Sequence, residues 1–108
     1  MTAEQCFKRN SLLVKEIREN HRGGENPLSS EQASKFLSEH GFCVKTKNIC
    51  KLINGIAKEW CLPICFINAK GYFWATKKSE IQETIADLQS RINALQEHIY
   101  HLNSFIIE

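Results

Sequence analysis

Lysines and asparagines recur at helical spacing between residues 45 and 58, and their chemistry suits a nucleic-acid groove. Lys47, Lys51, Asn54 and Lys58 are separated by four, three and four residues, so they share one side of a helix. Ammonium groups neutralise phosphates, and asparagine amides can donate to and accept from base edges. The predicted DNA-binding residues on this helix and at its positive end are Lys45, Thr46, Lys47, Asn48, Lys51, Asn54 and Lys58. The alternative is a solvated helix face with incidental lysines.

The charge is distributed unevenly along the chain, although the net charge is only +2. Residues 1–40 are neutral. Residues 41–78 hold seven lysines against Glu59 alone, a net charge of +6, and residues 79–108 hold Arg91 against five acidic residues, a net charge of −4. A compact basic block suggests a polyanionic partner, and the acidic tail suggests a segment that does not touch it.

Metal-dependent and nucleophilic chemistry find little support in the sequence. Cys61 and Cys65 flank the start of a predicted strand, whereas His98 and His101 lie on a distant helix, so the spacing gives no four-ligand zinc site. The sequence contains no glycine-rich phosphate loop, nucleophile elbow or carboxylate pair. We expect no metal, no cofactor and no enzymatic activity, and we expect the five cysteines to be reduced and mostly buried.

Three amphipathic helices must position the basic face. The first is expected over residues 4–20, the second from a Ser29–Gln32 capping box to Gly41, and the third from a Thr46 N-cap to about Trp60. Their apolar stripes are Phe7, Leu12, Leu13 and Ile17 in the first, Ala33, Phe36 and Leu37 in the second, and Ile49, Leu52, Ile53, Ile56, Ala57 and Trp60 in the third. The last two helices with their short link form a helix-turn-helix candidate.

A β-hairpin is expected after the third helix. Two apolar runs, 62–67 and 72–75, are separated by Asn68-Ala69-Lys70-Gly71, which is a turn signal. Pro63 confines the first strand to an edge or makes it start there. Alternation predicts that only one of Phe73 and the Tyr72/Trp74 pair faces inward.

The order helix, helix-turn-helix and hairpin resembles the winged-helix DNA-binding domains of bacterial and phage regulators over residues 5–76. The matching residues are Leu12-Leu13-Val14-Lys15-Glu16-Ile17, Pro27-Leu28-Ser29, Ile49, Ile53, Ile56, Leu62-Pro63-Ile64 and Gly71-Tyr72. The last two elements resemble the wing of the type-11 helix-turn-helix group and of biotin-repressor-like and DeoR-like proteins. The resemblance implies that the third helix reads the major groove and that the wing tip, Asn68-Ala69-Lys70, reaches the flanking backbone or minor groove. Those regulators usually place arginine on the recognition helix, whereas this sequence has only lysines there.

The last thirty residues carry an unbroken heptad pattern. Apolar residues recur at alternating intervals of four and three, and they are Ile81, Ile85, Leu88, Ile92, Leu95, Ile99, Leu102 and Ile106. Isoleucine at a and leucine at d favour a parallel two-stranded coiled coil, although the flanking positions do not settle strand orientation or oligomer number. The competing interpretation is a helix that folds back on the first helix or joins a larger bundle.

Length and composition fit one folded domain with an appendage, because 43% of the 108 residues are hydrophobic and 24% are charged. The longest apolar run has eight residues, against roughly 20 needed to cross a bilayer, and the N-terminus lacks a secretory signal. We therefore expect a cytoplasmic protein without membrane contact. It is expected to be α+β and mostly α, with a winged helix-turn-helix domain in residues 1–78 and a dimerisation helix in residues 79–108.

The leading functional hypothesis is a homodimeric, sequence-specific regulator that binds double-stranded DNA, encoded by a phage, mobile element or bacterium. Two alternatives stay open. One is a phage accessory or inhibitor protein that uses the winged fold to bind a host protein complex. The other is a replication-origin or architectural DNA-binding protein.

Overall fold

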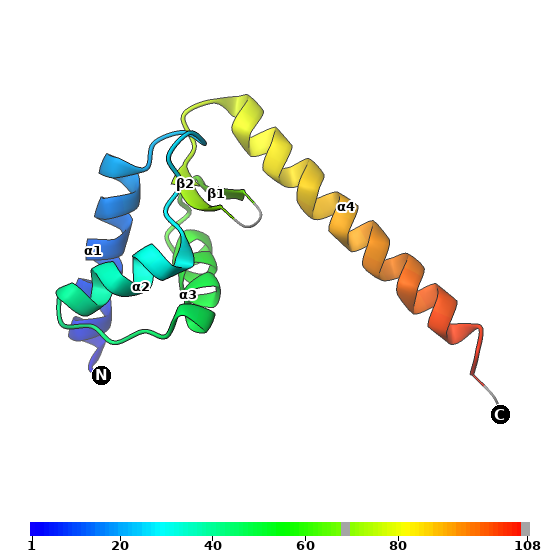
Figure 1. Cartoon of the computed structure of the whole chain (residues 1–108), viewed down its shortest axis with the longest axis horizontal. Helices are drawn as coiled ribbons and strands as arrows, with labels where there is room; N and C mark the ends of the chain where they lie inside the picture. The colour runs from blue at the N-terminus through cyan, green and yellow to red at the C-terminus, as the bar shows by residue number, and fades with distance from the viewer. Residues whose placement is uncertain (68–69, 107–108) are drawn as a thin grey trace.

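The computed structural model describes residues 1–67 and 70–106. Within these residues the elements are, in order, α1 (Ala3–Asn20), α2 (Ser30–Glu39), α3 (Thr46–Glu59), β1 (Ile64–Ile67), β2 (Gly71–Trp74) and α4 (Lys78–Asn103). The expected α+β, mostly helical class is confirmed. Helices α1, α2 and α3 and the hairpin gather into one body, and α4 projects away from it (Figure 1).

One apolar core joins the first three helices to the hairpin. Its buried members are Leu13, Val14, Ile17, Leu28, Ala33, Leu37, Ile49, Ile53, Ile56 and Tyr72. Because these side chains recur at three- and four-residue intervals, each helix turns one side inward. Phe36, Leu52 and Trp60 pack at the margin of this core. Phe7 departs from the predicted stripe of α1, since it is 64% exposed; its ring lies 5.7 Å from the ring of Trp60.

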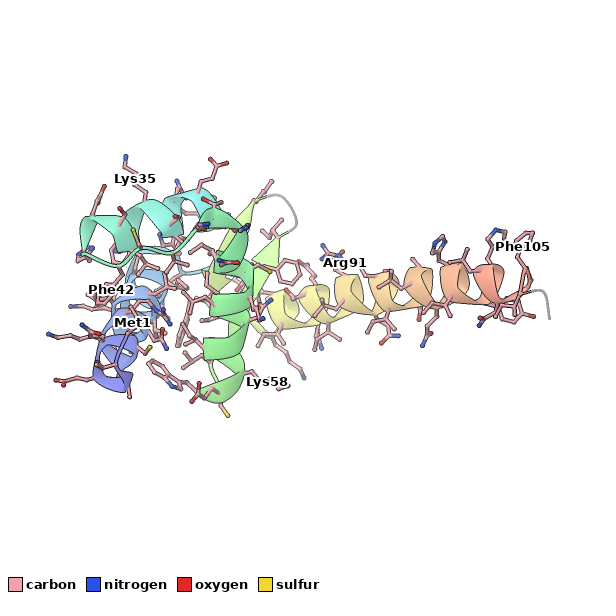
Figure 2. The ribbon with its side chains drawn as sticks, turned by 90° about the horizontal axis from the view of Figure 1, so that it is seen from below. Met1, Lys35, Phe42, Lys58, Arg91 and Phe105 are labelled. Atoms are coloured by element: carbon pink, nitrogen blue, oxygen red, sulfur yellow. The ribbon has the colours of Figure 1, made fainter. Side chains whose placement is uncertain are left out.

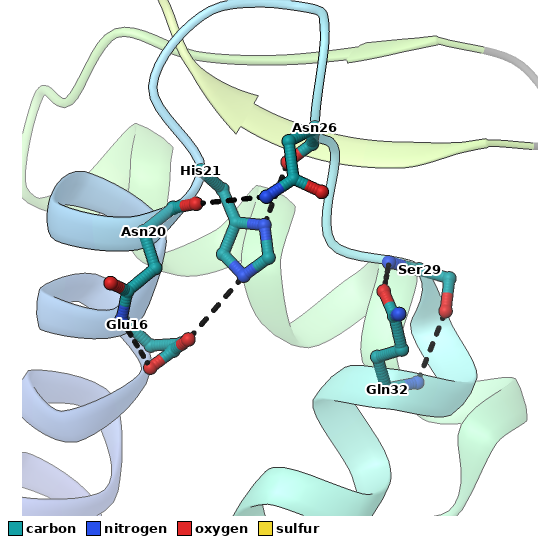
Figure 3. A network of polar contacts seen from close by, with 6 residues as sticks. All are labelled: Glu16, Asn20, His21, Asn26, Ser29 and Gln32. Carbon is teal, nitrogen blue, oxygen red and sulfur yellow. Dashed lines mark hydrogen bonds and ion pairs between the residues drawn. The ribbon is translucent and has the colours of Figure 1, made fainter.

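Local hydrogen bonds explain where the helices begin and end. The predicted capping box is confirmed, because Ser29 Oγ accepts from Gln32 N at 3.1 Å and Gln32 Oε1 accepts from Ser29 N at 3.0 Å (Figure 3). Gly41 follows α2 with a positive φ of 86°, as expected for a helix stop. The predicted Thr46 N-cap is wrong: Thr46 is the first helical residue, and Lys45 occupies the cap without a side-chain hydrogen bond.

The segment between α1 and α2 is held by a buried histidine. His21 is 8% exposed, its Nδ1 lies 2.7 Å from the carbonyl oxygen of Asn26, and its Nε2 lies 3.4 Å from Glu16 Oε1 (Figure 3). Asn26 in turn donates from Nδ2 to the carbonyl of Asn20 at 3.3 Å. These contacts fold the chain back toward the hairpin immediately after α1.

That segment also pairs with β2. Leu28 and Tyr72 exchange backbone hydrogen bonds of 2.7 and 2.8 Å, and further along Gly23 N donates to Trp74 O at 2.8 Å. Strand β2 therefore has β1 on one edge and the α1–α2 segment on the other. The sequence suggested only a helix break there.

The prediction that only one face of β2 is buried is wrong. Tyr72 is 6% exposed and belongs to the helical core, while Phe73 on the opposite face is 3% exposed. The Phe73 side is covered by the α1–α2 segment, where a Cβ added at Gly24 would lie 3.8 Å from Phe73 Cζ. Alternation predicts which residues share a face, but it does not say whether the second face is covered.

Helix α4 contacts this body through its N-terminal half. The Glu80 carboxylate accepts from Gly24 N at 2.8 Å, from Thr76 N at 2.8 Å and from Lys77 N at 3.1 Å. Farther along, the Arg91 guanidinium lies 5.1 Å from the centre of the Phe66 ring on β1. No residue of α4 is buried, so the alternative of a helix folded back on α1 is not what the structure shows.

The C-terminal helix is shorter than predicted. It ends at Asn103, where Ser104 Oγ donates to the carbonyl of His101 at 2.6 Å and the Phe105 ring packs on His101. The next residues follow with i→i−3 hydrogen bonds, and Ile106 lies beyond the helix. The proposed boundary between residues 78 and 79 stays a prediction. Among the described residues no helix is both long and apolar enough to cross a membrane.

Candidate nucleic-acid interface

All eight predicted DNA-binding residues are solvent-exposed: Lys45, Thr46, Lys47, Asn48, Lys51, Asn54, Lys58 and Lys70. The reason lies in α3, which turns Ile49, Ile53 and Ile56 into the core and so directs its opposite side outward. In Figure 2, α3 stands in front of the hairpin with Lys58 near its C-terminal end, and α4 leaves to one side. Asn68 and Ala69 of the predicted wing tip lie outside the described residues.

The lysines of this face have no carboxylate partner in the described part of the chain. The two ion pairs found there join His21 to Glu16 and Arg91 to Asp87. Helix α3 contains one acidic residue, Glu59, at its last position. The outward side of α3 therefore carries uncompensated positive charge, which attracts polyanions.

The structure divides the predicted residues between two concave surfaces. The first, called here the basic depression, has a volume of about 680 Å³ and is lined by Arg9, Cys43, Val44, Lys45, Lys47, Asn48, Lys51 and Leu52. Arg9 was missed by the sequence analysis, because no sequence signal indicates that the middle of α1 lies beside the start of α3.

The second surface is a groove between α3, the hairpin and α4, with a volume of about 620 Å³. Thr46, Cys50 and Asn54 line it from α3, and Lys70 lines it from the hairpin. Leu88 and Arg91 line it from α4, so the acidic segment, which is predicted not to touch a polyanionic partner, lies beside some of the predicted DNA-binding residues. Lys58 lines neither surface, so the four-residue stripe does not form a single concave site.

The floor of the groove is neutral. Asn54 Nδ2 donates to Cys50 Sγ at 3.4 Å, and the Tyr72 hydroxyl lies against the same thiol. Burial raises the pKa of Tyr72 above its usual value, and the contact with Cys50 acts in the same direction, so the hydroxyl stays protonated. The groove therefore offers an amide, a thiol and a hydroxyl beside the charged side chains of Lys70, Arg91 and Glu31.

The prediction that the cysteines are mostly buried is wrong. Cys65 is buried and Cys6 is half-buried, but Cys43, Cys50 and Cys61 are exposed. Cys43 lies in the link between α2 and α3, Cys61 follows the end of α3, and Cys50 lies on the outward side of α3. At these places apolar character alone does not bring a side chain into the core. In residues 1–67 and 70–106 no three His, Cys, Asp or Glu side chains gather closely enough to hold a metal ion.

The predicted dimerisation residues form an open apolar stripe on α4. Seven of the eight lie on the helix, with exposures from 38% at Ile81 to 63% at Leu95; the eighth, Ile106, follows the helix and is 70% exposed. Ile81 and Leu88 are the least exposed because the first turns of α4 contact β1. Toward the C-terminus the stripe has no neighbour within the described chain (Figure 1).

Comparison of the chain with protein-family models, with curated proteins and with solved structures found no match. The winged-helix resemblance stays a prediction that depends on the sequence motifs and on the order of helices and strands.

Proposed function

We propose that this protein is a DNA-binding regulator of the winged-helix kind, which places α3 in the major groove of a duplex and dimerises through α4. The observation that carries the proposal is the outward side of α3, where exposed lysines stand without acidic partners. A solvated helix of incidental lysines would ordinarily mix both signs of charge.

Helix α3 has suitable dimensions for this role. Its 14 residues extend about 21 Å, and the major groove, about 12 Å wide, admits one α-helix. Lys47, Lys51 and Lys58 would neutralise phosphates and set the register, while Asn48 and Asn54 would read base edges. Asparagine pairs best with adenine through its N6 and N7 atoms, so we propose adenine-containing half-sites.

The exposed apolar stripe of α4 supports the proposed dimerisation. Most of the stability of a helix in a protein comes from packing of its apolar face, and an apolar stripe is normally covered. The exposed Ile and Leu residues of α4 would be covered by the same face of a second copy. A dimer would bring two α3 helices to one duplex and double the number of phosphate contacts.

The test is a charge reversal on α3. The triple variant Lys47→Glu, Lys51→Glu, Lys58→Glu is expected to abolish duplex binding in a fluorescence-anisotropy titration while the far-UV circular dichroism spectrum is retained. Reversal removes three attractive contacts and adds three repulsive ones. Probe duplexes come from selection of bound fragments out of a random pool at physiological salt.

The matched control reverses Lys8, Lys15 and Lys35, which are exposed and line neither concave surface. This control has the same net charge as the test variant and is expected to keep most of the affinity. Equal affinity of the α3 variant and the wild type would reject the α3 face as the binding surface.

A second candidate function is a protein-binding adaptor that docks on a host complex. The open stripe on α4 favours it, because such a stripe fits a helix of another protein as well as a second copy. A wild-type chain that selects no duplex and sediments as a monomer would favour the adaptor. An origin-binding or architectural role would be distinguished by the location of the selected sites in a genome.

A further inference from the structure

The basic depression combines four cationic side chains from three parts of the chain. Arg9 comes from α1, Lys45 from the link before α3, and Lys47 and Lys51 from α3. Among the residues that the structure describes, no acidic side chain lines it. Four like charges around one open depression repel one another, and an anion placed among them relieves this repulsion.

Arg9 reaches the depression because of its place on α1. It lies one helical turn before Leu13, which is fully buried, so it projects from the same side of α1 at the margin of the core. That margin faces the start of α3. The packing of α1 against the core therefore places the Arg9 guanidinium beside α3. Helix α3 itself contains no arginine.

The guanidinium of Arg9 is partly buried but has donors to spare. Nε donates to Asn10 Oδ1 at 3.1 Å, and one terminal nitrogen lies 3.5 Å from the sulfur of Met1. Neither partner is charged, and no carboxylate within the described residues pairs with it. A guanidinium in this state is suited to a phosphate, to which it can donate two parallel hydrogen bonds.

The groove on the other side of α3 is less suited to a phosphate chain. Glu31 lines it together with Lys70 and Arg91, and the Arg91 guanidinium is already paired with Asp87 at 3.0 Å. Within residues 1–67 and 70–106, the basic depression has twice as many cations as the groove and no acidic residue. The charge distribution thus favours the side of α3 that faces α1 over the side that faces α4 as the place for a phosphate chain.

We propose that the basic depression holds the phosphodiester backbone of the duplex read by α3, so that α1 contributes a DNA contact through Arg9. This inference rests on the proposed function. In this arrangement one phosphodiester backbone of the duplex crosses the start of α3 toward α1. Arg9 then supplies the guanidinium that α3 lacks.

The test compares Arg9→Gln with Arg18→Gln. Arg18 is exposed on α1, nine residues away and therefore on the opposite side of the helix, and it provides the same change of charge. Duplex affinity is measured by anisotropy between 50 and 200 mM salt, with thermal unfolding as the check on folding. Arg9→Gln is expected to weaken binding to all duplex sequences alike. It is also expected to make the negative slope of log K against log salt shallower by about one per protomer. Arg18→Gln is expected to keep the wild-type slope.

The outcomes separate this inference from the proposed function. If the wild type binds duplex and the two variants show the same slope, the role of Arg9 is overturned and the α3 face stands. If no duplex binds, both fail. A second arm titrates the wild type with inorganic phosphate: saturation at micromolar concentration, absent in Arg9→Gln, would assign the depression to a free anion and overturn the proposal.

Discussion

Glu80 fixes the direction in which α4 leaves the body. Its carboxylate accepts backbone hydrogen bonds from Thr76, Gly24 and Lys77, and a further one from the Thr76 hydroxyl. The backbone hydrogen bond from Thr76 is the largest cause of a lowered Glu80 pKa, and those from Gly24 and Lys77 add to it, while desolvation opposes it. One side chain thus ties the α1–α2 segment to the first turn of α4.

Because the folded-state pKa of Glu80 is lowered, its stabilisation is present above the usual carboxyl pKa and is lost as pH falls through the lowered value. Glu80→Gln is therefore expected to lower the melting temperature at pH 7, and its difference from wild type should shrink below about pH 4.3. The control is Glu83→Gln, an exposed position on the same helix, which should melt like wild type. A difference that persists undiminished at pH 3 would contradict the role of the charged carboxylate.

At the scale of the elements, the position of the hairpin depends on the close pairing of β2 with the α1–α2 segment. Gly71 makes this pairing possible, because its φ is 136° and a Cβ there would lie 2.2 Å from the carbonyl oxygen of Leu28. A side chain at this position meets backbone that cannot move without breaking the Leu28–Tyr72 hydrogen bonds. The β1–β2 hairpin is therefore held in place by a glycine.

Gly71→Ala is expected to cost about 3 kcal/mol or more in the free energy of unfolding, through backbone strain and lost hydrogen bonds. Gly41→Ala is the matched comparison, because Gly41 also has a positive φ but no atom of the described residues lies within 4 Å of its added Cβ. Its cost should be about 1–2 kcal/mol, the conformational term alone. Urea unfolding of both variants measures the difference in the free energy of unfolding. Equal losses in the two variants would show that the close approach of Gly71 to Leu28 does not add to the cost of a side chain at residue 71.

At the scale of the whole molecule, the Glu80 hydrogen bonds and the open apolar stripe of α4 determine how a second copy would be placed in the proposed dimer. The chain extends 54 Å along its longest axis, mainly because α4 projects from the body (Figure 1). A second copy paired along α4 would be positioned through the same joint at Glu80. The separation of two α3 helices would then be set by the structure of each protomer and not by a flexible linker.

Ile92→Asp is expected to convert the proposed dimer into a monomer, because it places a charge in the centre of the covered stripe. Ser90→Asp adds the same charge on the opposite side of α4 and should leave the dimer intact. Sedimentation equilibrium at micromolar concentration measures both, and circular dichroism at matched concentration reports the helix content. A wild-type monomer in this experiment would remove the dimer from the proposal.

The sequence by itself determined the features that depend on local periodicity and on turn chemistry. The three- and four-residue spacing of Ile49, Ile53 and Ile56 predicted which side of α3 is buried, and the Ser29 capping box predicted the start of α2. The exposure of the lysines follows from the same periodicity, since the side opposite a buried stripe faces solvent.

Only the tertiary structure decided which separate segments meet. It brought Arg9 beside Lys45 and Lys47, paired the α1–α2 segment with β2 so that Tyr72 and Phe73 are both buried, and set Arg91 against Phe66. These contacts join residues far apart in the chain, and no periodic signal within one segment specifies its neighbour. The physical reason is that local propensity sets the inward side of an element, whereas packing between elements decides what that side, and its margins, will touch.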